Sequence, residues 1–282
     1  MILPSISYII SSMVKELSGR ELAGFVKERQ AHLVRSLRGQ KIFPKLLILR
    51  DSDNPVITKY VELKKHYGED IGVAVEDFVA QNLDELKNKI NEANRNKAIS
   101  GMIVQLPLKN ADKDQIDEVV QLIASEKDVD GLSGNGKFDS ATATAINWLL
   151  AGYDINLENK AIALVGRGRL VGAPLYKMLT NSNYHVELFH RGSNLEDLKN
   201  FDVIITATGV PHLIKSEYIK NGAVIVDAGT ASEKGVLMGD LDEAVRNRED
   251  LAAITPKLGG VGPLTVSVLF ENVIFAATQQ NS

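Results

Sequence analysis

Short apolar runs alternate with amphipathic stretches through the first half of the chain. The runs lie at 45–49, 73–79 and 101–105, and segments with apolar residues at helical spacing lie at 19–38, 55–71 and 82–97. Parallel strands joined by helices produce this rhythm, because each crossover needs a long connection to bring the chain back. The pattern predicts an α/β domain with a parallel sheet.

The second half repeats the alternation after a stretch at 131–140 that contains several Gly, Ser and Asn residues. Its expected strands lie near 161–165, 185–189, 202–206 and 222–227. The last segment, from Pro263 onward, is apolar at helical spacing, so we expect a helix that packs back on the first domain. We predict two α/β domains, one at 1–139 completed by the helix at 264–282, and one at 140–263.

Composition limits the partners of this chain. Its 282 residues are 44% hydrophobic and 24% charged, with a formal net charge of -4 and an isoelectric point near 5.8. Both signs of charge are scattered along the chain, so we expect a small-molecule substrate and neither nucleic acid nor a membrane as partner. The apolar opening at 1–14 lacks a basic cluster and is shorter than the ~20 residues of a membrane span, so we interpret it as a packed N-terminal arm.

The chain has no cysteine. This excludes disulfides, thiolate metal sites and cysteine nucleophiles, and it permits a cytoplasmic location, which we expect. Redox chemistry would need a cofactor. The histidines lack ligand spacing, so no metal site is expected; they are His32, His66, His185, His190 and His212.

Lys64 occupies a position that helical periodicity reserves for an apolar side chain. Ile57, Tyr60, Val61 and Lys64 fall on one stripe of the helix expected after Pro55. A buried ammonium is costly unless it is paired or loses its proton, so such a lysine tends toward a lowered pKa and chemical use. The alternative is a lysine that lays its methylenes on the stripe and keeps its amine in water. Tyr60, one turn earlier, can reach the same ligand as Lys64.

Two polar positions follow the third strand. Gln105 ends the run GMIVQ, which puts an amide at the carboxyl edge of the first sheet, where substrates of α/β proteins gather. Asp130 precedes a glycine turn and is suited to accept two N–H bonds from a heterocycle. Spacing alone does not bring these side chains to Lys64.

A glycine-rich loop follows the strand AIALV in the second half. Gly166, Gly168 and Gly172 have the spacing GxGxxxG, and the loop between them carries Arg167, Arg169 and Val171. Glycines let the backbone approach a pyrophosphate, which the free N–H groups of a helix N-terminus attract. The context predicts a Rossmann-type dinucleotide site, and a plain turn between strand and helix is the alternative.

The next strand ends at His190, Arg191 and Ser193, where an NAD site would usually have an acid for the ribose hydroxyls. Arg191, with Arg167 or Arg169, is suited to hold a 2′-phosphate, so we predict NADP as the cofactor. Solvated arginines are the alternative. Small residues after two later strands leave room for the nicotinamide and its ribose; they are Thr208, Gly209 and Gly229.

Several ordered segments resemble the bifunctional methylenetetrahydrofolate dehydrogenase/methenyltetrahydrofolate cyclohydrolase family, over nearly the whole chain. They are NPVITKYVELK (54–64), GMIVQLPL (101–108), KDVDGLSGNG (127–136), VGRGRLVGAP (165–174), VIVDAG (224–229), GDLD (239–242) and GGVGPLT (259–265). The resemblance implies NADP-dependent oxidation of 5,10-methylenetetrahydrofolate and hydrolysis of the methenyl product to 10-formyltetrahydrofolate. It also implies a folate cleft between a catalytic and an NADP-binding domain, and usually a homodimer.

The resemblance implies roles for particular residues. The catalytic candidates are Tyr60, Lys64, Gln105 and Asp130, with Lys64 as the acid/base group of the hydrolysis and Asp130 on the N–H edge of the pterin. Binding of the tetrahydrofolate is expected to involve Tyr60, Gln105 and Asp130 together with Leu106, Pro107, Gly260, Pro263 and Thr265.

The chain departs from the family pattern in three loops. The family usually carries LPLP, PCTPxG and PGG, whereas this chain has Lys109, Ser140 and Leu258 at the corresponding proline positions. Because proline fixes φ, its loss is expected to loosen the walls of the folate cleft. None of the four chemical candidates is missing, which favours an active enzyme.

Three alternatives remain open at this stage. The first is a dehydrogenase without cyclohydrolase activity, and the second is a nucleotide-binding relative without turnover. The third is another oxidoreductase of the same cofactor fold, such as a shikimate-type dehydrogenase, which does not account for YVELK, VQLPL and GGVGPLT together.

Overall fold

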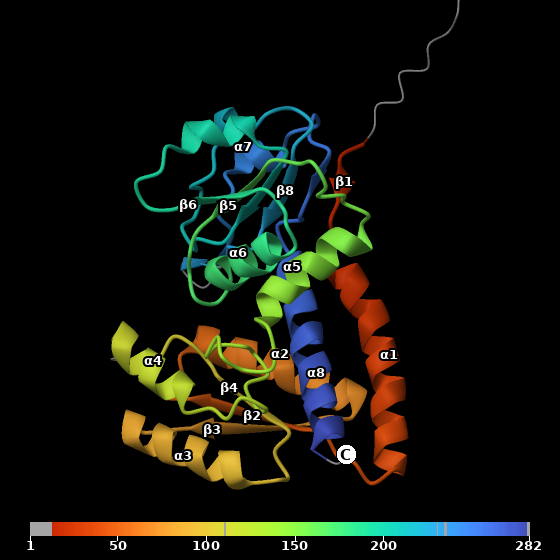
Figure 1. The fold of residues 1–282 in the computed structure, drawn as a ribbon, viewed down its shortest axis with the longest axis vertical. Coiled ribbons are helices and arrows are strands. Elements are labelled where there is room, and N and C mark those ends of the chain that lie inside the picture. Colours follow the sequence, from red (N-terminus) through yellow and green to blue (C-terminus); the bar gives the residue numbers. More distant parts are fainter. Residues whose placement is uncertain (1–12, 110, 230, 234–235, 281–282) are drawn as a thin grey trace, which may run out of the picture.

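The computed structural model describes residues 13–109, 111–229, 231–233 and 236–280. These residues form two α/β units, one above the other in Figure 1, with the long helices α1 (Gly19–Gly39) and α8 (Val261–Gln279) running side by side along the lower unit. The predicted two-domain α/β class is confirmed. The predicted N-terminal arm at 1–14 falls almost wholly outside the described residues.

The first unit is a three-stranded parallel sheet with helices on both faces. Its elements are β2 (Lys45–Arg50), α2 (Pro55–Ile71), β3 (Ala74–Val79), α3 (Leu83–Arg95), β4 (Gly101–Val104) and α4 (Lys113–Gln121), with strand order β3-β2-β4. Leu46 and Ile48 of β2 join the core shared with α2 and α8, whereas Leu47 and Leu49 join the core under α3 and α4. Burial on both faces explains why β4 and the middle of β2 are continuous apolar runs, whereas the edge strand β3 is only partly buried and carries Glu76 and Asp77.

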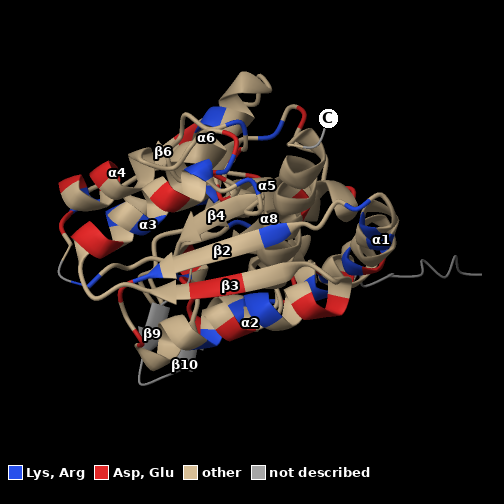
Figure 2. Ribbon diagram, turned by 90° about the horizontal axis from the view of Figure 1, so that it is seen from below, with Lys and Arg blue, Asp and Glu red and all other residues tan. Residues whose placement is uncertain are grey.

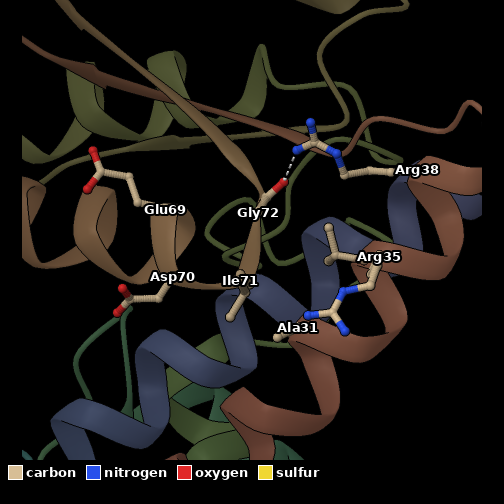
Figure 3. A pocket seen from close by; sticks show the side chains of 8 residues that line it. Ala31, Arg35, Arg38, Glu69, Asp70, Ile71 and Gly72 are labelled. Atoms are coloured by element: carbon tan, nitrogen blue, oxygen red, sulfur yellow. Dashed lines mark hydrogen bonds between the residues drawn. The ribbon is translucent and has the colours of Figure 1, made fainter.

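Both ends of α2, the helix that carries Lys64, are fixed. Asn54 accepts a hydrogen bond from the backbone of the first turn at 2.9 Å, and Pro55 occupies the first helical position. Gly72 ends the helix in the left-handed region, at φ 82°. Arg38 of α1 donates a hydrogen bond to the Gly72 carbonyl at 3.0 Å (Figure 3). These contacts set the place of α2 against the sheet and against α1.

The second unit is a six-stranded parallel sheet of order β1-β11-β8-β7-β5-β6. Its strands are β1 (Lys15–Glu16), β5 (Ile162–Val165), β6 (Val186–Phe189), β7 (Val203–Thr206), β8 (Val224–Asp227) and β11 (Ala253–Ile254). The helices α5 (Ala141–Gly152), α6 (Gly172–Asn181) and α7 (Glu243–Arg246) and the pair β9 (Ala231–Glu233) and β10 (Val236–Met238) complete it. Because β6 and β7 lie on opposite sides of β5, the strand order reverses at β5, and such a reversal is where sheets of this type bind ligands.

The C-terminal helix α8 packs against α1, α2 and α5, so its predicted return to the first domain is confirmed. The rings of Tyr67 and Phe270 stack with centroids 5.0 Å apart. The Tyr67 hydroxyl donates to buried Gln30 at 2.8 Å, and Gln30 donates to the Ser267 carbonyl at 2.8 Å. By length and composition α8 could cross a membrane, and in this fold its apolar residues form part of the core.

Charged residues of both signs interleave along α1, α2 and α3, whereas α4 is mainly acidic (Figure 2). Several of them form ion pairs between helices, as Lys27 of α1 does with Asp70 of α2 and Arg29 of α1 with Glu271 of α8. Exposed pairs of this kind contribute little to stability, about 0–1 kcal/mol each. Their mixed arrangement matches the scattered charge of the sequence.

Candidate active site

The Lys64 amine lies beside the amide of Gln105. Lys64 is half-buried, on the stripe of α2 that also carries the buried residues Ile57 and Val61. Its Nζ donates a hydrogen bond to Gln105 Oε1 at 2.8 Å. This contact joins the middle of α2 to the carboxyl end of β4.

Gln105 is held by both its backbone and its side chain. Its N–H donates to the Leu49 carbonyl at 2.8 Å, which continues the β2–β4 ladder one residue beyond β4. Its Nε2 donates to the Leu106 carbonyl at 3.1 Å. The bond from Nε2 orients the side chain so that Oε1, its acceptor, faces the Lys64 amine.

A polar turn between α4 and α5 positions Asp130. Asp128 is fully buried and accepts hydrogen bonds from the Leu132 N–H (3.1 Å), the Ser133 N–H (2.9 Å) and the Ser133 hydroxyl (2.6 Å). Lys127 points the other way, because its Nζ donates to two carbonyls at the end of α3, both at 2.7 Å. Of the two aspartates in this turn, Asp130 is the one whose charge raises the pKa of Lys64.

A residue of α8 also contacts this turn. Asn272 Nδ2 donates a hydrogen bond to the carbonyl of Val129 at 2.8 Å, next to Asp130. Asn272 is not among the residues predicted from the sequence, because a single amide in an apolar helix carries no periodic signal. The contact shows that the C-terminal helix supports the site directly.

Burial changes the pKa of three candidate groups. Desolvation lowers the pKa of Lys64, and the charge of Asp130 partly offsets this. Desolvation raises the pKa of Asp130 to about 7, although the Lys64 charge opposes the change. Burial also raises the pKa of the Tyr60 phenol, so this group stays protonated at neutral pH. An amine with a lowered pKa near a carboxyl that titrates around neutrality can exchange protons with a ligand at physiological pH.

The glycine loop runs from β5 into α6 with a backbone that excludes side chains at two points. Gly166 has φ +110°, and a Cβ there would lie 2.5 Å from the Ala207 carbonyl oxygen. A Cβ on Gly172 would lie 2.1 Å from the Gly166 carbonyl oxygen. Val171 provides no side-chain cap for α6, and the Ala173 N–H donates to the Gly168 carbonyl at 3.0 Å, which closes the loop onto the helix. The loop has the form that dinucleotide binding requires.

The three arginines predicted to bind the cofactor differ in their surroundings. Arg169 forms an ion pair with Asp117 of α4, in the first unit. Arg167 and Arg191 are exposed. The backbone N–H of His190 donates to the Ser193 hydroxyl at 3.0 Å, which closes the turn around Arg191. The binding of a 2′-phosphate by Arg167 and Arg191 stays a prediction.

The predicted folate residues at the start of α8 lie in its first turn and just before it. Gly260 precedes the helix and packs closely on α1, because a Cβ on Gly19 would lie 2.0 Å from the Gly260 carbonyl oxygen. Pro263 and Thr265 follow, and the Thr265 hydroxyl donates to the Val261 carbonyl at 3.2 Å. These contacts fix the turn, and the substrate role of its residues stays a prediction.

A hollow of about 330 Å³ lies away from these groups, between α1 and the end of α2. Arg35 and Arg38 line it together with Glu69 and Asp70 (Figure 3). It carries both signs of charge, and none of the chemical candidates lines it, so we place the site at Lys64 instead. In the described part of the chain, no three His, Asp or Glu side chains group as a metal site.

Comparison with known proteins assigns the chain to a family. A model of the catalytic domain of tetrahydrofolate dehydrogenase/cyclohydrolase matches residues 17–130, and a model of the NAD(P)-binding domain matches residues 140–281. The chain belongs to the tetrahydrofolate dehydrogenase/cyclohydrolase family. The family expected from the sequence segments is confirmed, and with it the enzyme class that the two activities define.

Individual relatives of this family match over nearly their whole length. The chain is 36% identical to the bifunctional protein FolD of Macrococcus caseolyticus, over 93% of this chain and 97% of that protein. The bifunctional FolD enzyme of Campylobacter jejuni has a TM-score of 0.87 and 31% identity, covering 94% of this chain and 99% of its own. The FolD enzyme of Trypanosoma brucei, solved with NADP and an inhibitor, has a TM-score of 0.86 and 26% identity, covering 95% and 98%.

Lys109 and Ser140 replace prolines of the tetrahydrofolate dehydrogenase/cyclohydrolase pattern. Both form hydrogen bonds that proline cannot form, because it has neither an N–H nor a hydroxyl group. The Lys109 N–H donates to both carboxylate oxygens of Asp51, at 2.9 and 2.8 Å. The Ser140 hydroxyl accepts from the Ala143 N–H at 3.3 Å and donates to the Leu170 carbonyl at 2.6 Å. The first contact ties the loop after β4 to β2, and the second ties the glycine loop to α5. The loosening expected from proline loss is offset at these two places.

Proposed function

We propose that this protein catalyses both reactions of its family, with Lys64, Tyr60, Gln105 and Asp130 as the chemical residues. In the first reaction 5,10-methylenetetrahydrofolate is oxidised to 5,10-methenyltetrahydrofolate with NADP, and in the second water converts that product to 10-formyltetrahydrofolate. The observation that carries the proposal is the 2.8 Å hydrogen bond from Lys64 to Gln105. It holds a desolvated amine at the carboxyl edge of the catalytic sheet, where substrates bind.

In the oxidation, the main task of the chain is alignment. When bound, NADP supplies the acceptor for the hydride that leaves the methylene carbon. Asp130 accepts N–H bonds from the pterin edge, Tyr60 packs on the folate, and Leu106 and Pro107 form the adjoining wall. Fixing the pterin in this way raises the rate because the reacting carbon is held within reach of its acceptor.

In the hydrolysis, Lys64 moves protons. Water adds to the cationic methenyl carbon, and the neutral Lys64 amine takes one proton from it. The resulting ammonium donates that proton to the ring nitrogen as its bond to carbon breaks, and the remaining hydroxyl proton is released as the formyl carbonyl forms. A lowered pKa favours this cycle, because the amine must be neutral in the first step.

The cofactor is assigned to the second unit. The loop from Gly166 to Gly172 holds the pyrophosphate, which its side-chain-free backbone at Gly166 and Gly172 lets approach closely. Arg167 and Arg191 hold the 2′-phosphate, since the end of β6 has no acid for ribose hydroxyls. Thr208, Gly209 and Gly229 leave room for the nicotinamide. Pro263 and Thr265, with Gly260, complete the folate side.

We also propose that the protein is a cytoplasmic homodimer whose domains meet near residues 139 and 140. The first helical residue after that boundary is Ala141, where α5 begins. Light scattering of the purified protein tests the dimer: a mass of one chain would contradict it.

A spectrophotometric assay with 5,10-methylenetetrahydrofolate and each nicotinamide cofactor tests the function. We expect NADP reduction followed by formation of 10-formyltetrahydrofolate. Accumulation of the methenyl compound would support a dehydrogenase alone, and cofactor binding without turnover would support a non-catalytic relative. A clear preference for NAD would contradict the roles of Arg167 and Arg191.

A further inference from the structure

Asp240 reaches the carboxyl end of β7, although it belongs to a distant segment just after β10. Its side chain is fully buried. Oδ2 accepts hydrogen bonds from the Thr206 hydroxyl at 2.5 Å and from the Thr208 N–H at 2.7 Å, and Oδ1 accepts from the Val210 N–H at 3.1 Å. One carboxylate therefore holds the loop that leaves β7 at three points.

Asp240 also touches the end of β8. A Cβ on Gly229 would lie 2.1 Å from Asp240 Oδ1, so the carboxylate occupies the space of any larger residue at 229. Asp227, the last residue of β8, accepts hydrogen bonds from the Asp240 N–H at 3.1 Å and the Gly229 N–H at 3.0 Å. Arg246 of α7 pairs with Asp227. Asp240 is thus wedged between two strand ends, with its own backbone fixed.

The surroundings of Asp240 indicate what this arrangement serves. Among the described residues no Lys or Arg forms an ion pair with it, and its donors are N–H and O–H groups from the end of β7 and the loop after it. Burying a carboxylate is costly unless several donors converge on it. That loop contains Thr208 and Gly209, at the strand ends where the sheet order reverses and ligands bind.

We propose that Asp240 is a positioning residue for the dehydrogenase reaction. It fixes the backbone from Thr208 to Val210 and the approach to Gly229, against which the nicotinamide-bearing half of NADP binds. This inference rests on the proposed function, because it takes those residues as the cofactor wall. The carboxylate itself lies behind the wall and does not touch the reacting atoms.

Asp240→Asn tests the inference through the two activities of one protein. The amide keeps the size of the side chain, but its NH2 group would face N–H or O–H groups that also donate, so the loop should shift. We expect kcat/KM for NADP to fall by roughly 10–100-fold, mainly through a higher KM. Hydrolysis of added methenyltetrahydrofolate uses no NADP, so its rate should stay within about twofold of the wild type.

Asp202→Asn is the matched control. Asp202 accepts a hydrogen bond from the Ala161 N–H at 2.9 Å and pairs with Lys220 at 2.8 Å, at the opposite, amino end of β7. Losing this carboxylate should leave the KM for NADP unchanged. A rise in KM as large as that of Asp240→Asn would overturn the inference, since position along the strand would then not matter.

Other outcomes also decide the question. Unchanged NADP kinetics in folded Asp240→Asn, or an equal loss of both activities, would overturn the inference by leaving Asp240 a purely structural role. If that variant does not fold, Thr206→Val removes one donor to Asp240 with little change of shape. It should raise the KM for NADP by roughly 3–10-fold and preserve hydrolysis. An unchanged KM in this variant would overturn the inference. A wild type that neither binds nor reduces NADP would refute the proposed function itself.

Discussion

Replacing Lys64 with Met should abolish hydrolysis while the dehydrogenase and the fold survive. Met keeps the length and apolar stem on the stripe of α2 but has no proton to exchange. A positioned acid/base group typically contributes roughly 10²–10⁴-fold, or about 3–5 kcal/mol of barrier. We therefore expect cyclohydrolase activity to fall at least ~100-fold. The oxidation should fall less, because the hydride leaves without a proton from Lys64.

The stability of Lys64→Met follows from two opposing contributions. The variant loses the hydrogen bond to Gln105 and leaves that amide oxygen without its donor, which costs about 1–3 kcal/mol. It also removes an ammonium whose pKa is lowered by burial. A lowered pKa means that the folded state disfavours the charged form, so this group costs stability at neutral pH and ceases to do so above its ordinary pKa. The two effects should leave the unfolding free energy within about 1 kcal/mol of the wild type.

The assay follows the loss of methenyltetrahydrofolate absorbance, NADPH formation and thermal unfolding for each variant. Lys65→Met is the matched control, since Lys65 is the next residue of α2 and pairs with Glu62 at 2.9 Å and Asp77 at 3.3 Å. We expect it to keep both activities. Folded Lys64→Met that hydrolyses within tenfold of the wild type would remove the lysine from the mechanism.

Three further changes test other parts of the site. Asp130→Ala should weaken folate binding at least ~10-fold and NADP binding much less, and titration calorimetry showing equal weakening would contradict a pterin-edge role. Asp130→Asn should stabilise the protein at pH 8, by at most about 4 kcal/mol, and little at pH 4. The reason is that a carboxyl whose pKa is raised to about 7 in the folded state costs stability only when the pH exceeds its pKa in the unfolded state. Denaturant unfolding that shows the opposite trend would disprove this. Asp51→Ala should raise the KM for folate by roughly 3–10-fold, and adding Lys109→Pro should lower this KM part of the way back, because proline fixes φ. An unchanged KM in the single variant would show that the hydrogen bond between Asp51 and Lys109 does not support the folate wall.

Much of the fold is predictable from the sequence, because strand and helix periodicity are local. The apolar runs at 45–49, 101–105 and 202–206 correspond to β2, β4 and β7, and the expected helix at 55–71 is α2 with the same bounds. Other elements were not predicted, even where the period is clear, as at Ile116, Val119 and Val120 of α4. These include α4, α5 and the short strand β1, which crosses to pair with β11 of the second sheet.

The placement of Lys64 on an apolar stripe and the glycine loop are determined by the sequence itself, since each depends on residues that are neighbours along the chain or within one helical turn. The family is also determined by the sequence, because its ordered segments are compared along the chain and need no contact with one another. The hydrogen-bond partners of the site residues are decided by the tertiary structure. The contacts of Lys64 with Gln105, of Asn272 with Val129 and of Asp240 with the β7 loop join segments far apart in sequence. Such hydrogen bonds exist only when the sheets and α8 are packed, because donor and acceptor must come within about 3 Å, a condition that local periodicity does not encode.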